Sequence, residues 1–180
     1  MAMSNDLETA TQAAYRAGSL LLRYFRTNLD VSHKDGAFDP VTQADSEADD
    51  LLRSIISRQF PGDKLLTEEN PTRPVDYHGR VWMIDPLDGT KDFILGRETF
   101  SVIIGLLVDG EPAMGVVYLP STGELYYGLQ GHGAVREVNG ESAPISVSAV
   151  TALRDARMLV RIPTPEQRGL DKPIQALNVK

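Results

Sequence analysis

The stretch Trp82-Met-Ile-Asp-Pro-Leu-Asp-Gly-Thr-Lys-Asp-Phe93 joins an apolar run to two aspartates that flank a proline and a leucine. The residues from Val81 to Asp85 predict a buried strand. A proline directly after a strand favours a turn, and taken alone such an acidic turn is common. The rest of the sequence decides whether this turn is structural or carries chemistry.

A turn through the proline could aim the carboxylates of Asp85 and Asp88 at one point and expose the Leu87 carbonyl as a further oxygen ligand. Hard cations such as Mg²⁺ prefer oxygen ligands of this kind. The next residues, Gly89 and Thr90, are expected to open a helical turn whose N–H groups suit a phosphate. The stretch can therefore form a site for both a cation and a phosphate.

Two further acidic positions precede this stretch. Asp45 stands at the start of a predicted helix, and Glu68-Glu69 follows the short predicted strand Lys64–Thr67. Each has a simpler interpretation, because an aspartate suits a first helical turn and paired glutamates are usually solvated. Their joint occurrence with the two aspartates favours a metal site, but spacing alone leaves both interpretations open.

Hydrophobic periodicity predicts two helices followed by a series of strands. The helices cover about residues 5–25 and 42–60, and the second is ended by Pro61-Gly62. The strands are expected over residues 64–67, 81–85, 100–108, 113–119, 124–129 and 134–138, with hairpin signals at Asp109-Gly110 and Asn139-Gly140. Helices first and an antiparallel meander later predict an α+β domain. After about Thr151 the pattern fades, although Arg157–Arg161 could form a strand.

Composition excludes several classes of protein. The 180 residues carry a net charge of -7, which argues against a nucleic-acid polymer or an anionic membrane as partner. The longest apolar stretch is far too short to span a bilayer. The absence of cysteine rules out thiol nucleophiles and zinc-thiolate sites. With no signal peptide visible at the N-terminus, a cytoplasmic location is expected.

Competing motifs fit poorly. An EF-hand loop that starts at Asp85 fails, because its third, fifth and sixth positions are Leu87, Gly89 and Thr90. A haloacid-dehalogenase-type phosphatase would need its two aspartates closer together and near the chain start. The three histidines lie in loop or turn contexts and are expected on the surface: His33, His78 and His132. Without a credible histidine base, a metal-activated water is the best available nucleophile.

Several segments together resemble the inositol monophosphatase superfamily. They are Asp39-Pro-Val-Thr-Gln-Ala-Asp45, Thr67-Glu-Glu69, the stretch from Trp82 to Phe93, Gly115-Val-Val-Tyr-Leu-Pro120 and Gly131-His-Gly-Ala134. Their order and separations match that superfamily over about residues 5–150. The resemblance implies the N-terminal portion of a layered αβαβα sugar-phosphatase fold and a Mg²⁺-dependent, lithium-sensitive phosphomonoesterase.

The same resemblance implies a role for each acidic position. Glu68, Asp85 and the Leu87 carbonyl would hold one Mg²⁺ ion, and Asp85 with Asp88 a second, in a site of two or three ions. Thr90 would act on the attacking water.

In this arrangement Asp45 and Glu68 would share with Thr90 the task of orienting and deprotonating that water. The substrate phosphate would meet the backbone N–H groups of Gly89 and Thr90, with Asp88 and Lys91 also at the substrate. A small phosphorylated metabolite is the implied partner, and a homodimer is usual among similar proteins.

One departure from the family pattern concerns the second metal. Members carry a later Trp-Asp-x-Ala-Ala-Gly-like motif, whereas this chain has only Trp82, and neither Asp155 nor Asp171 has that context. The 180 residues are therefore expected to form a single, C-terminally incomplete phosphatase domain. A non-catalytic relative that binds metal or phosphate stays open as the alternative.

The residues after the glycine bear on the substrate. Lys91-Asp-Phe-Ile94 looks more like the bisphosphate-nucleotidase branch than like inositol monophosphatases. This favours a 3'(2'),5'-bisphosphate nucleotide slightly over inositol monophosphate, with histidinol phosphate or a sugar phosphate as further alternatives.

Overall fold

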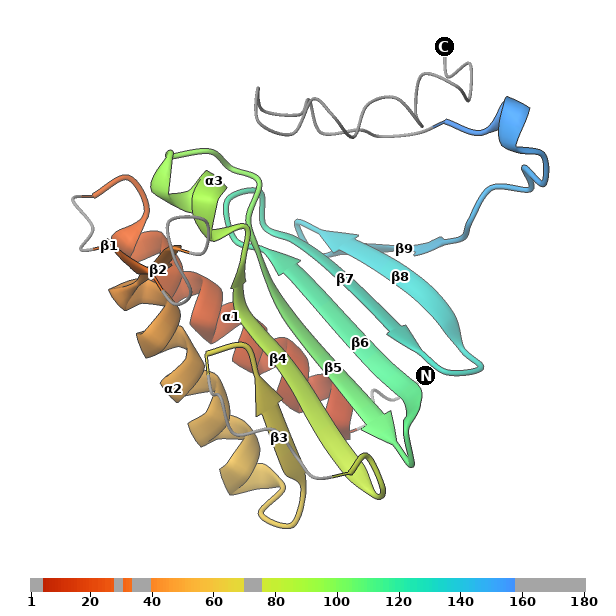
Figure 1. Cartoon of the computed structure of the whole chain (residues 1–180). Coiled ribbons are helices and arrows are strands. Elements are labelled where there is room, and N and C mark those ends of the chain that lie inside the picture. The colour runs from red at the N-terminus through yellow and green to blue at the C-terminus, as the bar shows by residue number, and fades with distance from the viewer. Residues whose placement is uncertain (1–4, 28–30, 34–39, 70–75, 158–180) are drawn as a thin grey trace. The chain divides into compact units, whose positions relative to one another are not determined.

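The computed structural model describes residues 5–27, 31–33, 40–69 and 76–157. The chain divides into two units, Met1–Ile145 and Ser146–Lys180. In the first unit, helices α1 (Asn5–Tyr24) and α2 (Gln43–Gln59) lie together on one face of a large sheet (Figure 1). The second unit contains a short 3₁₀ helix at Leu153–Asp155.

The large sheet has seven strands in the order β3-β4-β5-β6-β7-β8-β9, which is their order in the chain. Strands β3 and β4 are parallel, and every later neighbour pair is antiparallel. A separate antiparallel pair is formed by β1 (Val31–His33) and β2 (Pro40–Thr42). The strands of the large sheet are Lys64–Thr67, Arg80–Asp88, Ser101–Val108, Glu111–Leu119, Glu124–Leu129, Gly133–Val138 and Glu141–Ile145.

Helix α1 packs on the sheet through a stripe of small side chains. Its buried residues recur at helical spacing, and many are alanine, which lets the helix approach closely. At Gly18 a Cβ atom would lie 2.5 Å from the Tyr118 ring and 2.9 Å from Pro120. The Tyr118 ring on β6 and Pro120, which directly follows β6, therefore occupy the space that a larger residue at position 18 would need. The buried stripe is Leu7, Ala10, Thr11, Ala13, Ala14, Ala17, Gly18 and Leu21.

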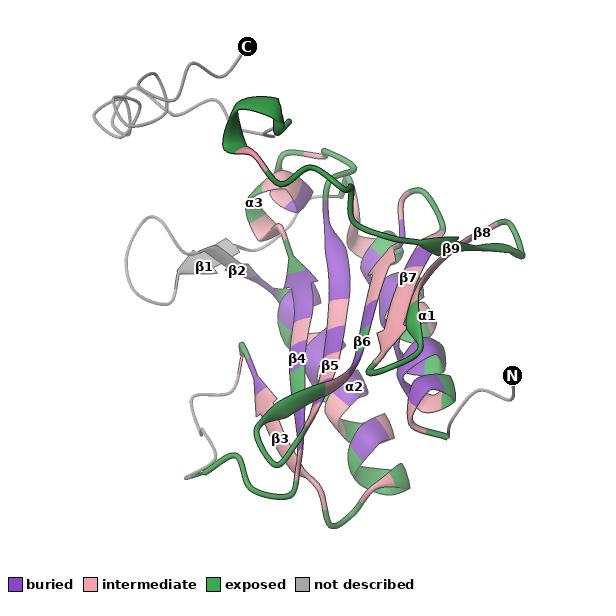
Figure 2. Cartoon of the chain, turned by 90° about the vertical axis from the view of Figure 1, so that its right-hand side faces the viewer, coloured by how far each residue is buried: buried purple, intermediate pink, exposed green. Residues whose placement is uncertain are grey.

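The two faces of the sheet differ along each strand. In β5, Val102, Ile104 and Leu106 belong to the core beneath the helices, whereas the alternate positions are only half-buried. Figure 2 shows this alternation of buried and partly exposed residues along the central strands. The core therefore lies between the helix layer and one face of the sheet, as an α+β layer arrangement requires.

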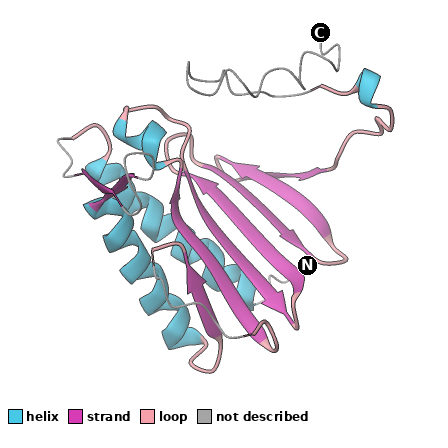
Figure 3. Ribbon diagram, viewed as in Figure 1, coloured by secondary structure: helices cyan, strands magenta, loops and turns pink. Residues whose placement is uncertain are grey.

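The predicted α+β class, the two helices and the meander are confirmed (Figure 3). Two details differ from the sequence prediction. Strand β4 does not end at Asp85 but continues to Asp88, with a register shift between those residues instead of a simple turn. The hairpin at Asn139-Gly140 leads into β9, a strand that the sequence pattern had not indicated. Residues 158–161 of the strand considered at Arg157–Arg161 lie outside the described residues.

Candidate active site

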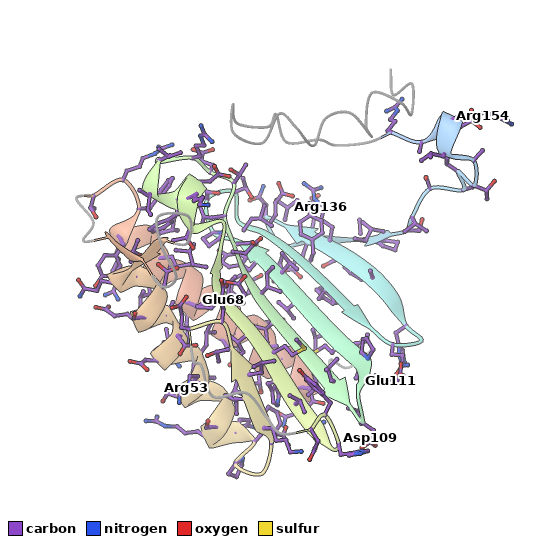
Figure 4. The ribbon with its side chains drawn as sticks, viewed as in Figure 1. Arg53, Glu68, Asp109, Glu111, Arg136 and Arg154 are labelled. Atoms are coloured by element: carbon purple, nitrogen blue, oxygen red, sulfur yellow. The ribbon has the colours of Figure 1, made fainter. Side chains whose placement is uncertain are left out.

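The parallel pair β3 and β4 brings two acidic residues together. Thr67 is the register partner of Ile84, and the Glu68 N–H continues the ladder with a 3.0 Å hydrogen bond to the Ile84 carbonyl. Glu68 and Asp85 therefore leave neighbouring strands at the same level. Figure 4 labels Glu68 at the end of β3, beside β4.

The carboxyl groups of Glu68 and Asp85 are hydrogen-bonded to each other. Burial, followed by repulsion from Glu68 and that hydrogen bond, raises the pKa of Asp85 to about 8, and the charge of Asp88 adds to the effect. Two carboxylates this close repel each other, and this repulsion disfavours the ionised form of Asp85 unless a positive charge lies beside it. Such a pair is well suited to a bound cation, which would supply that positive charge.

The irregular end of β4 is held by local hydrogen bonds. The Leu87 N–H donates to Asp85 Oδ1 at 3.1 Å, which fixes the Asp85 carboxyl against its own strand. The Leu87 side chain is buried at 2% exposure and anchors the segment in the core. The Leu87 carbonyl then accepts a hydrogen bond from Thr90 Oγ1 at 3.1 Å. Leu87 is thus fixed in the core while its carbonyl faces the polar groups.

Asp45 reaches this segment from the start of α2. Its carboxylate is buried and accepts hydrogen bonds from the Thr42 N–H at 2.8 Å and from Thr90 Oγ1 at 3.1 Å. The Thr42 hydroxyl donates to the same Asp45 oxygen as the Thr42 N–H. Burial raises the pKa of Asp45, and the hydrogen bonds from Thr42 and Thr90 oppose the increase. Asp45 therefore caps its helix and contacts the site with the same carboxylate.

Gly89 connects β4 to the short helix α3 (Thr90–Ile94). Its φ of 93° lies in the left-handed region, which glycine adopts without strain. A Cβ atom at this position would lie 2.7 Å from the Thr99 carbonyl oxygen. Both the backbone conformation and the close approach of the next loop therefore require glycine here. Phe93 on α3 packs edge-on against Phe100 and holds the helix to the core.

Asp88 and Lys91 lie on the exposed side of the segment. Asp88 Oδ2 accepts a hydrogen bond from Ser101 Oγ at 3.3 Å. Within the described part of the chain, no three Asp, Glu or His side chains lie close enough together to form a metal centre. The structure thus brings Glu68 and Asp85 together, with Asp88 acting on Asp85 through its charge. Glu69, the neighbour of Glu68, is half-buried.

Sequence reasoning missed three residues that support the site. Thr42 stands three positions before Asp45, a capping-box spacing that could have identified it. Ser101 is the first residue of β5 and pairs with Asp88 on β4, and no sequence pattern indicates this contact. Asp92 accepts hydrogen bonds from Arg97 at 2.9 Å and from Thr99 at 3.0 Å, so it clamps the loop that covers Gly89.

Of the three histidines, His78 and His132 are exposed, as expected. The side chain of His33 lies outside the described residues. No described helix is both long and apolar enough to cross a bilayer.

Comparisons with known proteins identify the family of this chain. A family model for the inositol monophosphatase family matches residues 2–178. The histidinol-phosphatase of Chlorobaculum parvum is 44% identical over 150 residues, which are 82% of this chain and 55% of that protein. The 3'(2'),5'-bisphosphate nucleotidase CysQ of Aggregatibacter actinomycetemcomitans is 33% identical over 83% of this chain and 58% of its own length.

Among solved structures, the extragenic suppressor protein suhB of Bartonella henselae superposes with a TM-score of 0.82 at 31% identity, over 97% of this chain and 67% of that chain. The fold and the family match define a member of a phosphatase family whose enzymes act on phosphoric monoesters. The chain belongs to the inositol monophosphatase family. It spans little more than half the length of the two curated relatives above.

Proposed function

We propose that this chain carries the metal-binding and water-activating part of a Mg²⁺-dependent phosphomonoesterase. The observation that supports this most strongly is the close pair of Glu68 and Asp85, with the Asp45–Thr90 hydrogen bond beside it. An acidic pair this close together is unfavourable in the absence of a cation. The family match supports the same function.

Glu68, Asp85 and the Leu87 carbonyl would hold the first ion, and Asp85 with Asp88 a second. Bound Mg²⁺ would neutralise the carboxylates and lower the pKa of a water molecule. We propose two or three ions, with Li⁺ as an inhibitor, as in the resemblance described above.

Thr90 and Asp45 would manage the proton of the attacking water. The Thr90 hydroxyl has one hydrogen, which can be donated either to Asp45 or to the Leu87 carbonyl at any moment. When the Leu87 carbonyl serves as an oxygen ligand, the hydroxyl turns fully to Asp45. The Thr90 oxygen can then accept a hydrogen bond from the water and orient it. Asp45, with its raised pKa, is a suitable final acceptor for the proton.

The substrate phosphate would lie against the backbone N–H groups of Gly89 and Thr90. The left-handed Gly89 has no side chain to cover these groups. Asp88 and the exposed Lys91 would contact the rest of the substrate. Because Lys91 is a flexible point charge, it would favour anionic substrates in general without selecting one.

The substrate class follows from the relatives. The 44% identity to a histidinol-phosphatase makes histidinol phosphate the first substrate to test. A 3'(2'),5'-bisphosphate nucleotide, which the Lys91-Asp-Phe pattern favours, and inositol monophosphate are the next candidates. We expect the protein to act in the cytoplasm on such small metabolites, and a homodimer remains part of the proposal.

The test has two stages. Calorimetric titration of Mg²⁺ into the 180-residue chain should release or absorb heat and raise its Tm, and Asp85→Asn should abolish both effects. Phosphate release from the three substrates is then measured with Mg²⁺, with a chelator and with Li⁺. No heat and no change in Tm would contradict the metal site. Mg²⁺ binding without phosphate release from any substrate would favour the non-catalytic relative.

A further inference from the structure

Helix α1 is followed by a residue in a backbone conformation that its side chain does not favour. Tyr24 is the last residue of the helix, and its carbonyl accepts a 3.1 Å hydrogen bond from the Thr27 N–H. Arg26, inside this turn, has a φ of 61°, in the left-handed region. Helices commonly end with glycine in this conformation, because other L residues are strained there. The contacts of the Arg26 side chain explain why an arginine occupies this position.

The Arg26 side chain reaches the loop that follows α3. Its Nε atom donates to the Gly96 carbonyl at 3.2 Å, and its Nη2 atom forms an ion pair with Glu98 at 3.1 Å. These partners lie 70 and 72 positions further along the chain. A guanidinium has several donors in a fixed, planar arrangement, so it can hold two groups of one loop at once.

An aromatic contact supports the same grip. The Arg26 Cζ atom lies 4.8 Å from the centroid of the Phe25 ring, a distance at which a cation is attracted to the ring. The Phe25 ring packs against Phe93 and Phe100, with centroid distances of 5.5 and 5.0 Å. Phe93 belongs to α3, so two neighbouring residues at the end of α1 contact both α3 and the loop after it (Figure 1). We call Phe25 and Arg26 the α1 clasp.

Helix α3 depends on such contacts for its orientation. It has only five residues, and a left-handed glycine stands on each side of it, Gly89 with a φ of 93° and Gly96 with a φ of 68°. A helix this short is not stable on its own, and glycine lets the backbone turn at both ends. The hydrogen bonds that Asp92 accepts from Arg97 and Thr99 stay within the same segment. They therefore do not fix α3 against the rest of the fold.

Thr90 is the residue for which this orientation matters most. It is the first residue of α3, and its hydroxyl oxygen lies 3.1 Å from both Asp45 Oδ1 and the Leu87 carbonyl oxygen. These two acceptors belong to other elements, α2 and β4. Because 3.1 Å is already long for a hydroxyl donor, a small tilt of α3 would weaken at least one of the hydrogen bonds.

The hydrogen bonds and ion pair of Arg26 add little to the stability of the fold. The Arg26 and Glu98 side chains are 60% and 58% exposed, and exposed ion pairs of this kind contribute little. The left-handed backbone of Arg26 opposes even that gain. Asparagine adopts this conformation more readily than arginine does. Arg26→Asn should therefore keep a Tm within about 3 °C of the wild type.

We propose that Arg26 is a positioning residue for Thr90. Together with Phe25 it holds the C-terminal end of α3, so that the Thr90 hydroxyl stays between Asp45 and the Leu87 carbonyl. Arg26 acts on the attacking water only through this hydroxyl. The consequence for catalysis rests on the proposed function, whereas the positioning of Thr90 is a property of the fold and can be tested without metal or substrate.

The first test is a double-mutant cycle on stability. The wild type, Arg26→Asn, Thr90→Val and the double variant are unfolded by heat in the absence of Mg²⁺. If Arg26 positions the Thr90 hydroxyl, removal of that hydroxyl should lower the Tm in the Arg26→Asn background by about half as much as in the wild type, or less. An equal loss of Tm in both backgrounds would mean that the two residues act independently and would overturn the proposal.

Arg136→Asn is the matched control for the cycle. Arg136 on β8 also forms an ion pair with a glutamate, Glu124, at 3.0 Å, and its side chain is 42% exposed. Thr90→Val should lower the Tm by the same amount with and without this substitution. A smaller loss in the Arg136→Asn background as well would show that the coupling reflects general destabilisation, and it would also overturn the proposal.

The second test measures the consequence for chemistry. Phosphate release from the three substrates named above is compared in the wild type, Arg26→Asn and Arg26→Lys. Arg26→Asn should lower kcat about fivefold or more, because the water is less well oriented, and leave KM within about twofold. Calorimetry should give a Mg²⁺ affinity within about twofold of the wild type, because Glu68 and Asp85 lie outside α3. Arg26→Lys, which retains a cationic donor, should recover part of the loss.

The outcomes separate this inference from the proposed function. An unchanged kcat in Arg26→Asn, with an active wild type, would overturn the role of Arg26 in catalysis. A wild-type chain that releases no phosphate from any substrate would contradict the proposed function, and the stability cycle then decides the positioning of Thr90 by itself.

Discussion

The Thr90 hydroxyl donates a hydrogen bond of 3.1 Å to Asp45 Oδ1, although the two residues lie 45 positions apart in the chain. This hydrogen bond connects the first turn of α3 to the first turn of α2. It places a titratable carboxylate directly behind the segment that carries Asp85 and Leu87. The relationship links the architecture of the helix layer to the chemistry at the end of β4.

Thr90→Val tests that link. Valine keeps the shape of threonine but removes the hydroxyl, so the buried Asp45 carboxylate loses one donor. We expect the free energy of unfolding to fall by about 1–3 kcal/mol, as measured by urea denaturation. Phosphate release should fall by about 10²-fold or more, because the water loses its orienting group. Thr90→Ser, which retains the hydroxyl, should recover most of the activity; an inactive serine variant would show that the methyl group matters instead.

Asp85→Asn tests the acidic pair of Glu68 and Asp85 through the pH dependence of stability. The pKa of Asp85 is raised to about 8 in the folded chain, above its unfolded value. The contribution of Asp85 to the free energy of unfolding is therefore fully present below its unfolded pKa. This contribution is lost as the pH rises toward 8. Without Mg²⁺, the wild-type Tm should decrease over this range, and the variant should be more stable than the wild type near pH 8.

Asp50→Asn serves as the control for the pH experiment. Asp50 lies on α2 with its side chain 82% exposed. Its variant should follow the wild-type pH profile and keep the Mg²⁺-dependent increase in Tm. If Asp85→Asn follows the same profile as Asp50→Asn, the acidic pair does not exist as described.

Gly89→Ala should be more destabilising than an alanine at an unconstrained left-handed glycine. Gly131 has a φ of 76° and open space around its Cβ position, so Gly131→Ala measures the backbone cost alone, about 1–2 kcal/mol. At Gly89 the contact of 2.7 Å with the Thr99 carbonyl adds to that cost. Chemical denaturation of both variants gives the difference. Equal losses would mean that the Thr99 loop moves away freely.

Asp63→Ala should destabilise the end of the sheet where β4 begins. Asp63 accepts hydrogen bonds from Trp82 Nε1 at 2.7 Å and from Arg80 Nε at 2.8 Å. Its removal leaves a buried indole N–H without an acceptor, which costs about 1–3 kcal/mol. Asp6→Ala, which loses only the partly exposed Arg80 ion pair, should cost about 0–1 kcal/mol. The fluorescence of Trp82, the one tryptophan of the chain, reports both transitions.

Lys91→Gln tests whether Lys91 acts in the binding of anionic substrates or in the chemical step. Lys91 is exposed on α3, near the proposed phosphate site. Loss of its charge should raise KM most for the bisphosphate nucleotide, which has the largest negative charge, and leave kcat nearly unchanged. Steady-state kinetics with all three substrates give the comparison. A decrease in kcat with an unchanged KM would place Lys91 in the chemical step instead.

The sequence predicted the elements well because their signals are local. The alanine-rich stripe of α1 and the hairpin signals of the meander each depend on a few neighbouring residues. The continuation of β4 through Pro86 was not predictable in this way, because it depends on pairing of Asp88 with Ser101 across the sheet. Likewise β9 exists because β8 provides an edge for it to join.

The candidate site was predictable as a set of residues but not as an arrangement. Asp45, Glu68 and Asp85 were candidates from their order and spacing, the family resemblance implied their roles, and those roles remain predictions. The proximity of Glu68 and Asp85 depends on the parallel register of β3 and β4, which no local pattern encodes. The clamp formed by Asp92 also depends on the loop that returns over Gly89, so it could not be inferred from the motif alone.

The close contact of Gly18 with Tyr118 has a consequence during protein synthesis. Helix α1 is synthesised before the strand β6 that receives it, and that strand is completed only at Leu119. At a synthesis rate of about 5–20 residues per second, the apolar stripe of α1 waits several seconds for its partner. During that interval the part of the stripe that faces β6 has no strand to cover it. Packing of α1 against β6 therefore follows the synthesis of β6, whereas its packing against α2 can form earlier.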